Sequence, residues 1–278
     1  MKIYDTYQGK PVHELTLEND KIQLRLIDFG ARIVSCVLKE NGTDIVQGFD
    51  SLSGYLDGVR YMGTTVGRLC NRLEKGQFEL NGVHYQTPVN NGPNTLHGGP
   101  NGFDHQIFDV VEVSDHHVVY HYLSKDMEEG FPGNLHLNIT YRLLEDGFTF
   151  ESEATADKDT LCSITNHAFF NMNGCLSETA MNHVVRVNAQ RVGSSDGNGL
   201  TLKEAFEVEN TPFDFRVSKP IGRDIEEEFD QLIFGQGYDH NFAYIKQLAN
   251  EGKLGNLQTI KITSRDPEPP CIDYVKVS

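Results

Sequence analysis

Apolar and polar residues alternate with a period of two along much of this chain of 278 residues. Residues 135–143 alternate in this way, and residues 22–26 and 148–150 repeat the pattern on a shorter scale. Such alternation is typical of antiparallel strands with one buried face. Turn-forming pairs separate the strand-like segments: Asn41-Gly42, Asn81-Gly82, Asp146-Gly147 and Asn198-Gly199.

The sequence therefore predicts an all-β fold, a large antiparallel β-sandwich that forms one domain over residues 1–278. It has no linker rich in Pro, Gly or Ser and no short-period repeat. Only residues 202–206 and 223–229 are predicted to be helical. The order of the strands does not follow from the sequence.

The net charge indicates which class of ligand to expect, and the cysteine content indicates the cellular compartment. The net charge is −16, which argues against nucleic acid or an anionic membrane as a partner and favours a neutral ligand. The first twenty residues are polar and lack the apolar core of a signal peptide. Five widely spaced cysteines without a CxxC pair indicate reduced thiols, and we expect a cytoplasmic location. The sequence does not indicate an oligomeric state.

Five segments combine polar or charged side chains with glycine and aromatic residues, and each is predicted to lie in a loop or at a strand end. On a rigid β scaffold, loops are where binding residues gather. In chain order the segments are Gly67-Arg68-Leu69-Cys70-Asn71-Arg72, Asn94-Thr95-Leu96-His97-Gly98-Gly99, Glu129-Gly130-Phe131-Pro132-Gly133, Thr165-Asn166-His167-Ala168-Phe169-Phe170-Asn171 and Gly237-Tyr238-Asp239-His240-Asn241-Phe242.

These residue types suit a sugar, because a pyranose needs hydrogen-bonding partners for its hydroxyls and an aromatic surface for its ring. Histidines also transfer protons near neutral pH. Each residue alone fits a structural role equally well. His97 suits a loop bonded to backbone, His167 a satisfied core histidine, Asp239 a local turn and Arg72 a surface ion pair.

The order of the five segments resembles the aldose 1-epimerase family, also called galactose mutarotases, from about Gly30 to about Tyr244. The resemblance implies that family's β-sandwich and a free aldose, such as galactose or glucose, as substrate. It also implies that His167 is the general acid and that His97 takes part in catalysis and binding. Asn71, Arg72 and Asp239 would hold the sugar, while Phe169 stands where the family often has tyrosine.

The family reaction needs an acid at the ring oxygen and a base at the anomeric hydroxyl, on opposite sides of the anomeric centre. The ring opens to the aldehyde, the C1–C2 bond rotates, and the ring closes as the other anomer. By the resemblance, this chemistry uses no metal and no organic cofactor.

The resemblance fails near the C-terminus. The family's general base is a glutamate in a late strand, after a segment of the form P-x-x-Q-x-Y-T, and no such segment occurs here. Residues 271–277 resemble the strand before it, so we expect a C-terminally incomplete sandwich with impaired catalysis. Glu268 lies between prolines, which argues against it as a substitute base, and Asp273 is the other nearby carboxylate.

Three other functions compete with this interpretation. A non-catalytic carbohydrate-binding protein would use the same pocket without turnover. A hexose-phosphate epimerase would need more basic residues around the pocket than the charge of −16 suggests. A metal site of His97, His167, Asp239 and His240 is disfavoured, because the sequence has no HxH or HExxH spacing.

Overall fold

The computed structural model describes residues 1–58, 60–175 and 179–233, together with the backbone of residues 274 and 275. The chain divides into two compact units, Met1–Phe170 with Ile272–Ser278, and Asn171–Cys271. Each unit is described by itself below. The expectation of one domain over residues 1–278 stays a prediction.

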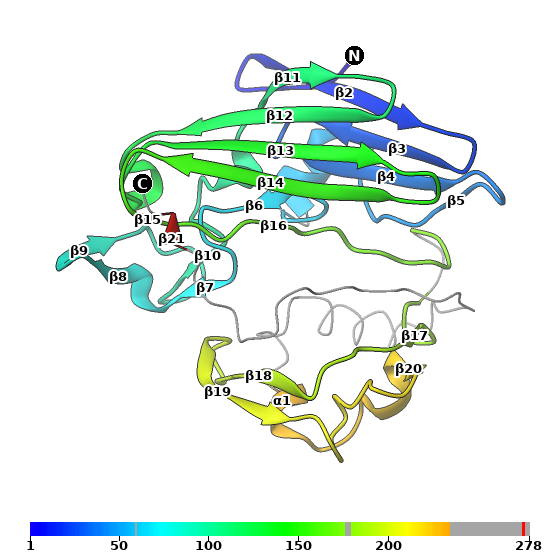
Figure 1. Ribbon diagram of the computed structural model, residues 1–278, viewed down its shortest axis with the longest axis vertical. Helices are drawn as coiled ribbons and strands as arrows, with labels where there is room; N and C mark the ends of the chain where they lie inside the picture. Colours follow the sequence, from blue (N-terminus) through cyan, green and yellow to red (C-terminus); the bar gives the residue numbers. More distant parts are fainter. Residues whose placement is uncertain (59, 176–178, 234–273, 276–278) are drawn as a thin grey trace. The chain divides into compact units, whose positions relative to one another are not determined.

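The first large sheet of the first unit is an antiparallel meander in the order β1-β2-β3-β4-β5 (Figure 1). Residue Leu24 of β3 lies opposite Cys36 of β4, and both are buried. The predicted alternation over 22–26 falls in β3. The strands are β1 (Lys2–Tyr7), β2 (Lys10–Glu18), β3 (Ile22–Ile27), β4 (Arg32–Leu38) and β5 (Thr43–Asp44).

The second large sheet has the order β11-β12-β13-β14 and is also antiparallel throughout (Figure 1). In β13 every second residue from Leu135 to Leu143 is buried, as the sequence predicts. The Tyr141 hydroxyl of β13 donates to the Ala31 carbonyl beside β4, at 2.7 Å. The strands are β11 (Asp109–Val113), β12 (His117–Ser124), β13 (Leu135–Leu143) and β14 (Phe148–Ala156). The predicted antiparallel β-sandwich is confirmed.

Short antiparallel strand pairs complete the first unit, and two of them carry candidate site residues. The pairs are β6 (Thr65–Val66) with β16 (Thr165–Asn166), β7 (Arg72–Leu73) with β10 (Thr95–Leu96), β8 (Gln77–Leu80) with β9 (Val83–Gln86), and β15 (Thr160–Leu161) with β21 (Tyr274–Val275). The last pair agrees with the strand expected over 271–277. Short helical turns lie at Gly54–Gly58, Glu74–Gly76, Phe103–His105 and Glu128–Gly130.

The second unit contains two further hairpin-like pairs, β17 (Val184–Val185) with β20 (Lys219–Pro220) and β18 (Arg191–Ser195) with β19 (Thr201–Glu207). A 3-10 turn at Ile221–Asp224 and the short helix α1 (Asp230–Ile233) follow.

Both helix predictions are wrong. Residues 202–206 belong to β19, because a turn at Asp196 and Gly199 returns the chain alongside β18. Of residues 223–229 only Arg223 and Asp224 are helical, at the end of the 3-10 turn, and residues 225–229 form turn and irregular structure before α1. The Asp224 carboxylate bonds Lys219 and Arg223 rather than capping a helix.

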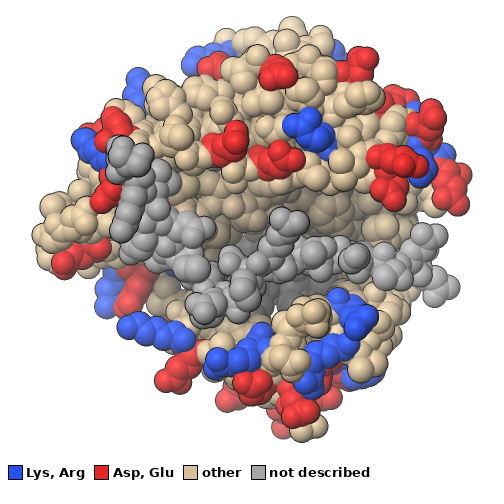
Figure 2. All heavy atoms as spheres, in the orientation of Figure 1, with Lys and Arg blue, Asp and Glu red and all other residues tan. Residues whose placement is uncertain are grey.

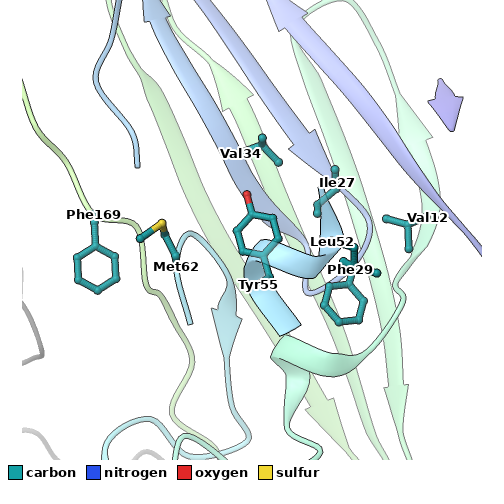
Figure 3. Close-up of a cluster of buried hydrophobic side chains, with 8 residues drawn as sticks. All are labelled: Val12, Ile27, Phe29, Val34, Leu52, Tyr55, Met62 and Phe169. Atoms are coloured by element: carbon teal, nitrogen blue, oxygen red, sulfur yellow. The ribbon is translucent and has the colours of Figure 1, made fainter. Parts of the chain in front are cut away.

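One cluster of buried side chains connects the first large sheet to the candidate site. Val12, Ile27 and Val34 come from β2, β3 and β4, and Phe29, Leu52, Tyr55, Met62 and Phe169 pack with them. Figure 3 shows Phe169 beside Met62, at one end of this cluster. The core therefore extends to within two residues of His167.

The negative charge lies on the outside of the molecule. Figure 2 shows Asp and Glu side chains spread over the face that is drawn, with Lys and Arg among them. Two carboxylates inside the first unit have cationic partners: Glu14 bonds Lys2 and Arg25, and Asp104 bonds Arg60.

Arg68 is a buried cation that ties three separate segments together. Its guanidinium donates to the Ser124 hydroxyl and carbonyl, the Lys125 and Pro132 carbonyls and the Thr160 hydroxyl, at 2.8–3.2 Å. The side chain of this arginine is 2% exposed, and burial lowers its pKa. It thus joins the end of β12, the Gly-Phe-Pro-Gly loop and β15.

We predict that Arg68→Lys destabilises the protein by about 3–5 kcal/mol, because one ammonium cannot satisfy so many acceptors and leaves buried carbonyls without donors. Urea unfolding measures the change. Arg142→Lys is the matched control, since Arg142 is half exposed and its ion pair with Glu151 is long, at 3.9 Å. Equal effects of the two substitutions would show that the buried bonds of Arg68 contribute little.

Candidate functional site

Residues 65–73, termed the central segment, bring the candidate site residues together. At its start β6 pairs with β16, just before His167. In its middle Leu69 bridges to Ser163, and at its end β7 pairs with β10, just before His97. Both histidines therefore follow short strands that are hydrogen-bonded to the same stretch of chain.

His97 and Asn71 are joined by two hydrogen bonds. The His97 amide donates to the Asn71 carbonyl at 3.0 Å, and the Asn71 amide donates to Nδ1 of the His97 ring at 3.0 Å. Because the amide can only donate, Nδ1 is the unprotonated nitrogen, and the neutral imidazole carries its proton on Nε2. The Nε2–H of neutral His97 is therefore a hydrogen-bond donor.

Both residues also occupy an unusual backbone conformation, with φ of 52° at His97 and 60° at Asn71. Non-glycine residues with positive φ are uncommon and gather at functional sites. Asparagine and histidine are among the residues that tolerate this region best. The two positive φ values turn the chain sharply on both sides of the hydrogen-bonded pair.

His167 is 5% exposed, and its backbone is fixed on both sides by residues 63 and 64. Its amide donates to the Thr64 carbonyl at 2.8 Å, and its carbonyl accepts from the Gly63 amide at 3.0 Å. The rings of His167 and His97 lie 5.1 Å apart and are nearly perpendicular, at 84°. The two predicted histidines therefore do converge.

Arg72 lies in β7, opposite Leu96 and next to the His97 loop. Its Nε donates to the Asn91 side chain at 2.9 Å, and its Nη1 donates to the Asn71 side chain at 3.4 Å. Arg72 as a whole is half-buried. Asn71, Arg72, His97 and His167 thus form one polar cluster.

Phe169 follows His167 by two residues, and its ring lies 5.1 Å from the imidazole. It is 8% exposed, and it packs against the buried cluster shown in Figure 3. Most of its ring therefore faces protein. Phe170, which is 41% exposed, offers more open aromatic surface.

Asp239 lies outside the described residues, as do His240, Glu268 and Asp273. Within the part of the chain that the structure describes, no group of three or more His, Cys, Asp or Glu side chains could hold a metal ion. The proposed roles of Asp239 and of any substitute base stay predictions.

Sequence reasoning missed two residues of this cluster. Tyr61 packs against both histidine rings, and Asn90 bonds the backbone of Leu96 through both its side-chain oxygen and its amide. Nothing in Arg60-Tyr61-Met62 distinguishes a site residue from a core residue, and Asn90 precedes an Asn-Gly pair that resembles a turn. Phe131 of the third segment instead packs in the core with Leu69 and Leu161.

The chain is similar to a known protein family and to characterised relatives. The sequence profile of the family described as Aldose 1-epimerase matches residues 13–269. A galactose mutarotase of Bos taurus is 34% identical over 84% of this chain and 67% of its own length. An aldose 1-epimerase of Haemophilus influenzae is 34% identical over 87% of this chain and 72% of its own length.

A solved structure is also similar. The galactose 1-epimerase of Lactobacillus acidophilus superposes with a TM-score of 0.76, at 29% identity, over 85% of this chain and 70% of that one. The fold and the family match are those of a sugar isomerase. The chain belongs to the aldose 1-epimerase family.

None of the helices in the described part of the chain has the length and apolar character that crossing a membrane requires.

Gly98 directly follows His97, and we predict that alanine at this position destabilises the protein. Its φ is 88°, and an added Cβ would lie 1.8 Å from the Gly67 carbonyl oxygen in the central segment. We expect Gly98→Ala to cost at least about 2 kcal/mol of stability, because strain and a backbone clash add. Gly82→Ala is the control, since Gly82 has φ of 76° but open space around it.

Urea unfolding of the two variants separates the strain of the positive φ from the clash of the added Cβ with the backbone. Gly82→Ala should cost only about 1 kcal/mol, the strain of a positive φ alone. A Gly98→Ala variant no less stable than Gly82→Ala would contradict the close packing of the His97 loop on the central segment.

Proposed function

We propose that this protein is an aldose 1-epimerase that interconverts the α and β anomers of a free hexose such as galactose or glucose. The reaction opens and closes the pyranose ring by proton transfer. His167 protonates the ring oxygen as the general acid. His97, through Nε2–H, binds an oxygen of the sugar and assists the reaction.

The observation that carries the proposal is the convergence of residues from separate segments. His97 and His167 lie with their rings 5.1 Å apart, and Asn71, bonded to His97, also accepts from Arg72. Two imidazoles provide proton transfer, while the amide and the guanidinium suit the hydroxyls of a neutral sugar. Asp239 is proposed to hold a further hydroxyl, and Phe169 to supply part of the apolar surface.

A non-catalytic carbohydrate-binding protein would use the same side chains. The two functions differ in turnover, because a binding protein leaves the anomer ratio to the spontaneous reaction. The match to the family described as Aldose 1-epimerase over residues 13–269 favours the enzyme.

We expect His167→Gln to reduce the catalysed rate by about 10²–10⁴-fold, because glutamine keeps a hydrogen bond but cannot deliver a proton. Polarimetry on freshly dissolved α-glucose or α-galactose, with the spontaneous rate subtracted, measures it. His84→Gln is the control, since His84 is 85% exposed on the β8–β9 hairpin. Unchanged activity of His167→Gln would assign the acid to another residue.

The 278 residues contain no counterpart of the family's late-strand glutamate, so we expect activity on the order of 10²-fold below that of a relative that has it. Without a positioned carboxylate the anomeric hydroxyl gives its proton to water. The same polarimetric assay, run beside such a relative, tests this. Full activity would point to another carboxylate, and Glu268→Gln and Asp273→Asn would then identify it.

A further inference from the structure

We propose that Tyr61 is the positioning residue that sets the orientation of both histidines, and that it does so with its ring rather than its hydroxyl. The catalytic meaning of this inference rests on the proposed function, but the placement of the rings does not.

Tyr61 contacts both imidazoles in two different geometries. Its ring meets His97 edge to face, with centroids 4.6 Å apart and planes at 75°. The same ring lies nearly parallel to His167, with centroids 5.9 Å apart and planes at 29°. Since the histidine rings are perpendicular to each other, one rigid ring that contacts both defines their mutual angle.

Tyr61 is itself held from two directions. The Asn90 amide donates to the Tyr61 hydroxyl at 3.4 Å and to the Leu96 carbonyl at 3.1 Å, so it links the ring to the strand that carries His97. On the other side the Arg60 guanidinium lies 4.9 Å from the centre of the Tyr61 ring. Arg60 is anchored in turn by the buried carboxylate of Asp104, at 2.6 Å.

The hydroxyl has little part in proton transfer. Burial, with a smaller contribution from the negative charge of Asp104, raises the pKa of Tyr61 to about 12. The phenol therefore stays neutral at physiological pH and does not act as a base there. Its bond to Asn90 is long at 3.4 Å, which makes it a weak restraint.

The rate of the proposed ring opening depends on how the ring of the general acid, His167, is oriented. A general acid works only within hydrogen-bond reach of the atom it protonates, and an error of about 1 Å can cost on the order of 10²-fold. His167 is fixed at its backbone by residues 63 and 64, but its ring has to be oriented by its neighbours. Both Tyr61 and Phe169 contact the His167 ring.

The kinetic test compares Tyr61→Leu with Tyr61→Phe. Leucine removes the flat ring, and we expect kcat to fall by on the order of 10-fold to 10²-fold while KM changes by less than about threefold. Phenylalanine keeps the ring and should retain kcat within about twofold of the unmodified protein. Tyr85→Leu is the matched control, because Tyr85 is also half-buried and stacked, 5.0 Å from Phe78.

A double substitution separates positioning from a general loss of stability. If Tyr61 acts through His167, Tyr61→Leu should lower kcat little further in a His167→Gln background. The same fractional loss in both backgrounds, or a loss in Tyr85→Leu as large as in Tyr61→Leu, would overturn the proposal.

An NMR measurement tests the ring placement even if the protein turns over no aldose. The Nδ1 of His97 accepts from the Asn71 amide, so its ¹⁵N shift reports an unprotonated nitrogen while His97 is neutral. We expect Tyr61→Phe to hold the His97 ring against the Asn71 amide and so preserve this tautomer, and Tyr61→Leu to let the ring rotate away from that amide, so that both tautomers are populated. An unchanged tautomer in Tyr61→Leu would overturn the inference, whereas an inactive unmodified protein with the expected shifts would overturn only the proposed function.

Discussion

The candidate site depends on one buried cation in the middle of the central segment. Arg68 donates to acceptors on Ser124, Lys125, Pro132 and Thr160, so residues 65–73 are anchored to both β12 and β15. A buried guanidinium is costly unless every donor finds a partner. Since the partners come from distant segments, the arginine also ensures that these segments meet in only one arrangement.

Around that anchor, backbone hydrogen bonds and close backbone packing fix where the site residues lie in the chain. The loop after His97 packs on the Gly67 carbonyl so closely that only glycine fits at position 98. Backbone bonds also fix His97 to Asn71 and His167 to residues 63 and 64. Since both histidines directly follow short paired strands, their backbone is held by elements of regular structure rather than by free loops.

Much of the architecture could be predicted from the period-two pattern of the sequence. Where a prediction from the sequence was wrong, there is a physical cause. Residues 135–143 alternate as expected because a sheet face turned to the core accepts only apolar side chains at every second position. Residues 202–206 contain good helix formers but became a strand, since the turn before them pairs them with β18. Local propensity is weak compared with a register of hydrogen bonds to a neighbour.

By itself the sequence determined the class of fold, the family and the residue types that the chemistry needs, because alternation, turn residues and ordered motifs are local properties of the chain. Only the tertiary structure decided which of these residues meet. It brought Asn71, Arg72, His97 and His167 together, put Phe131 in the core, and placed Tyr61 against both imidazoles. Contacts between residues so far apart in the chain depend on strand pairing and on the packing around Arg68, which no local pattern encodes.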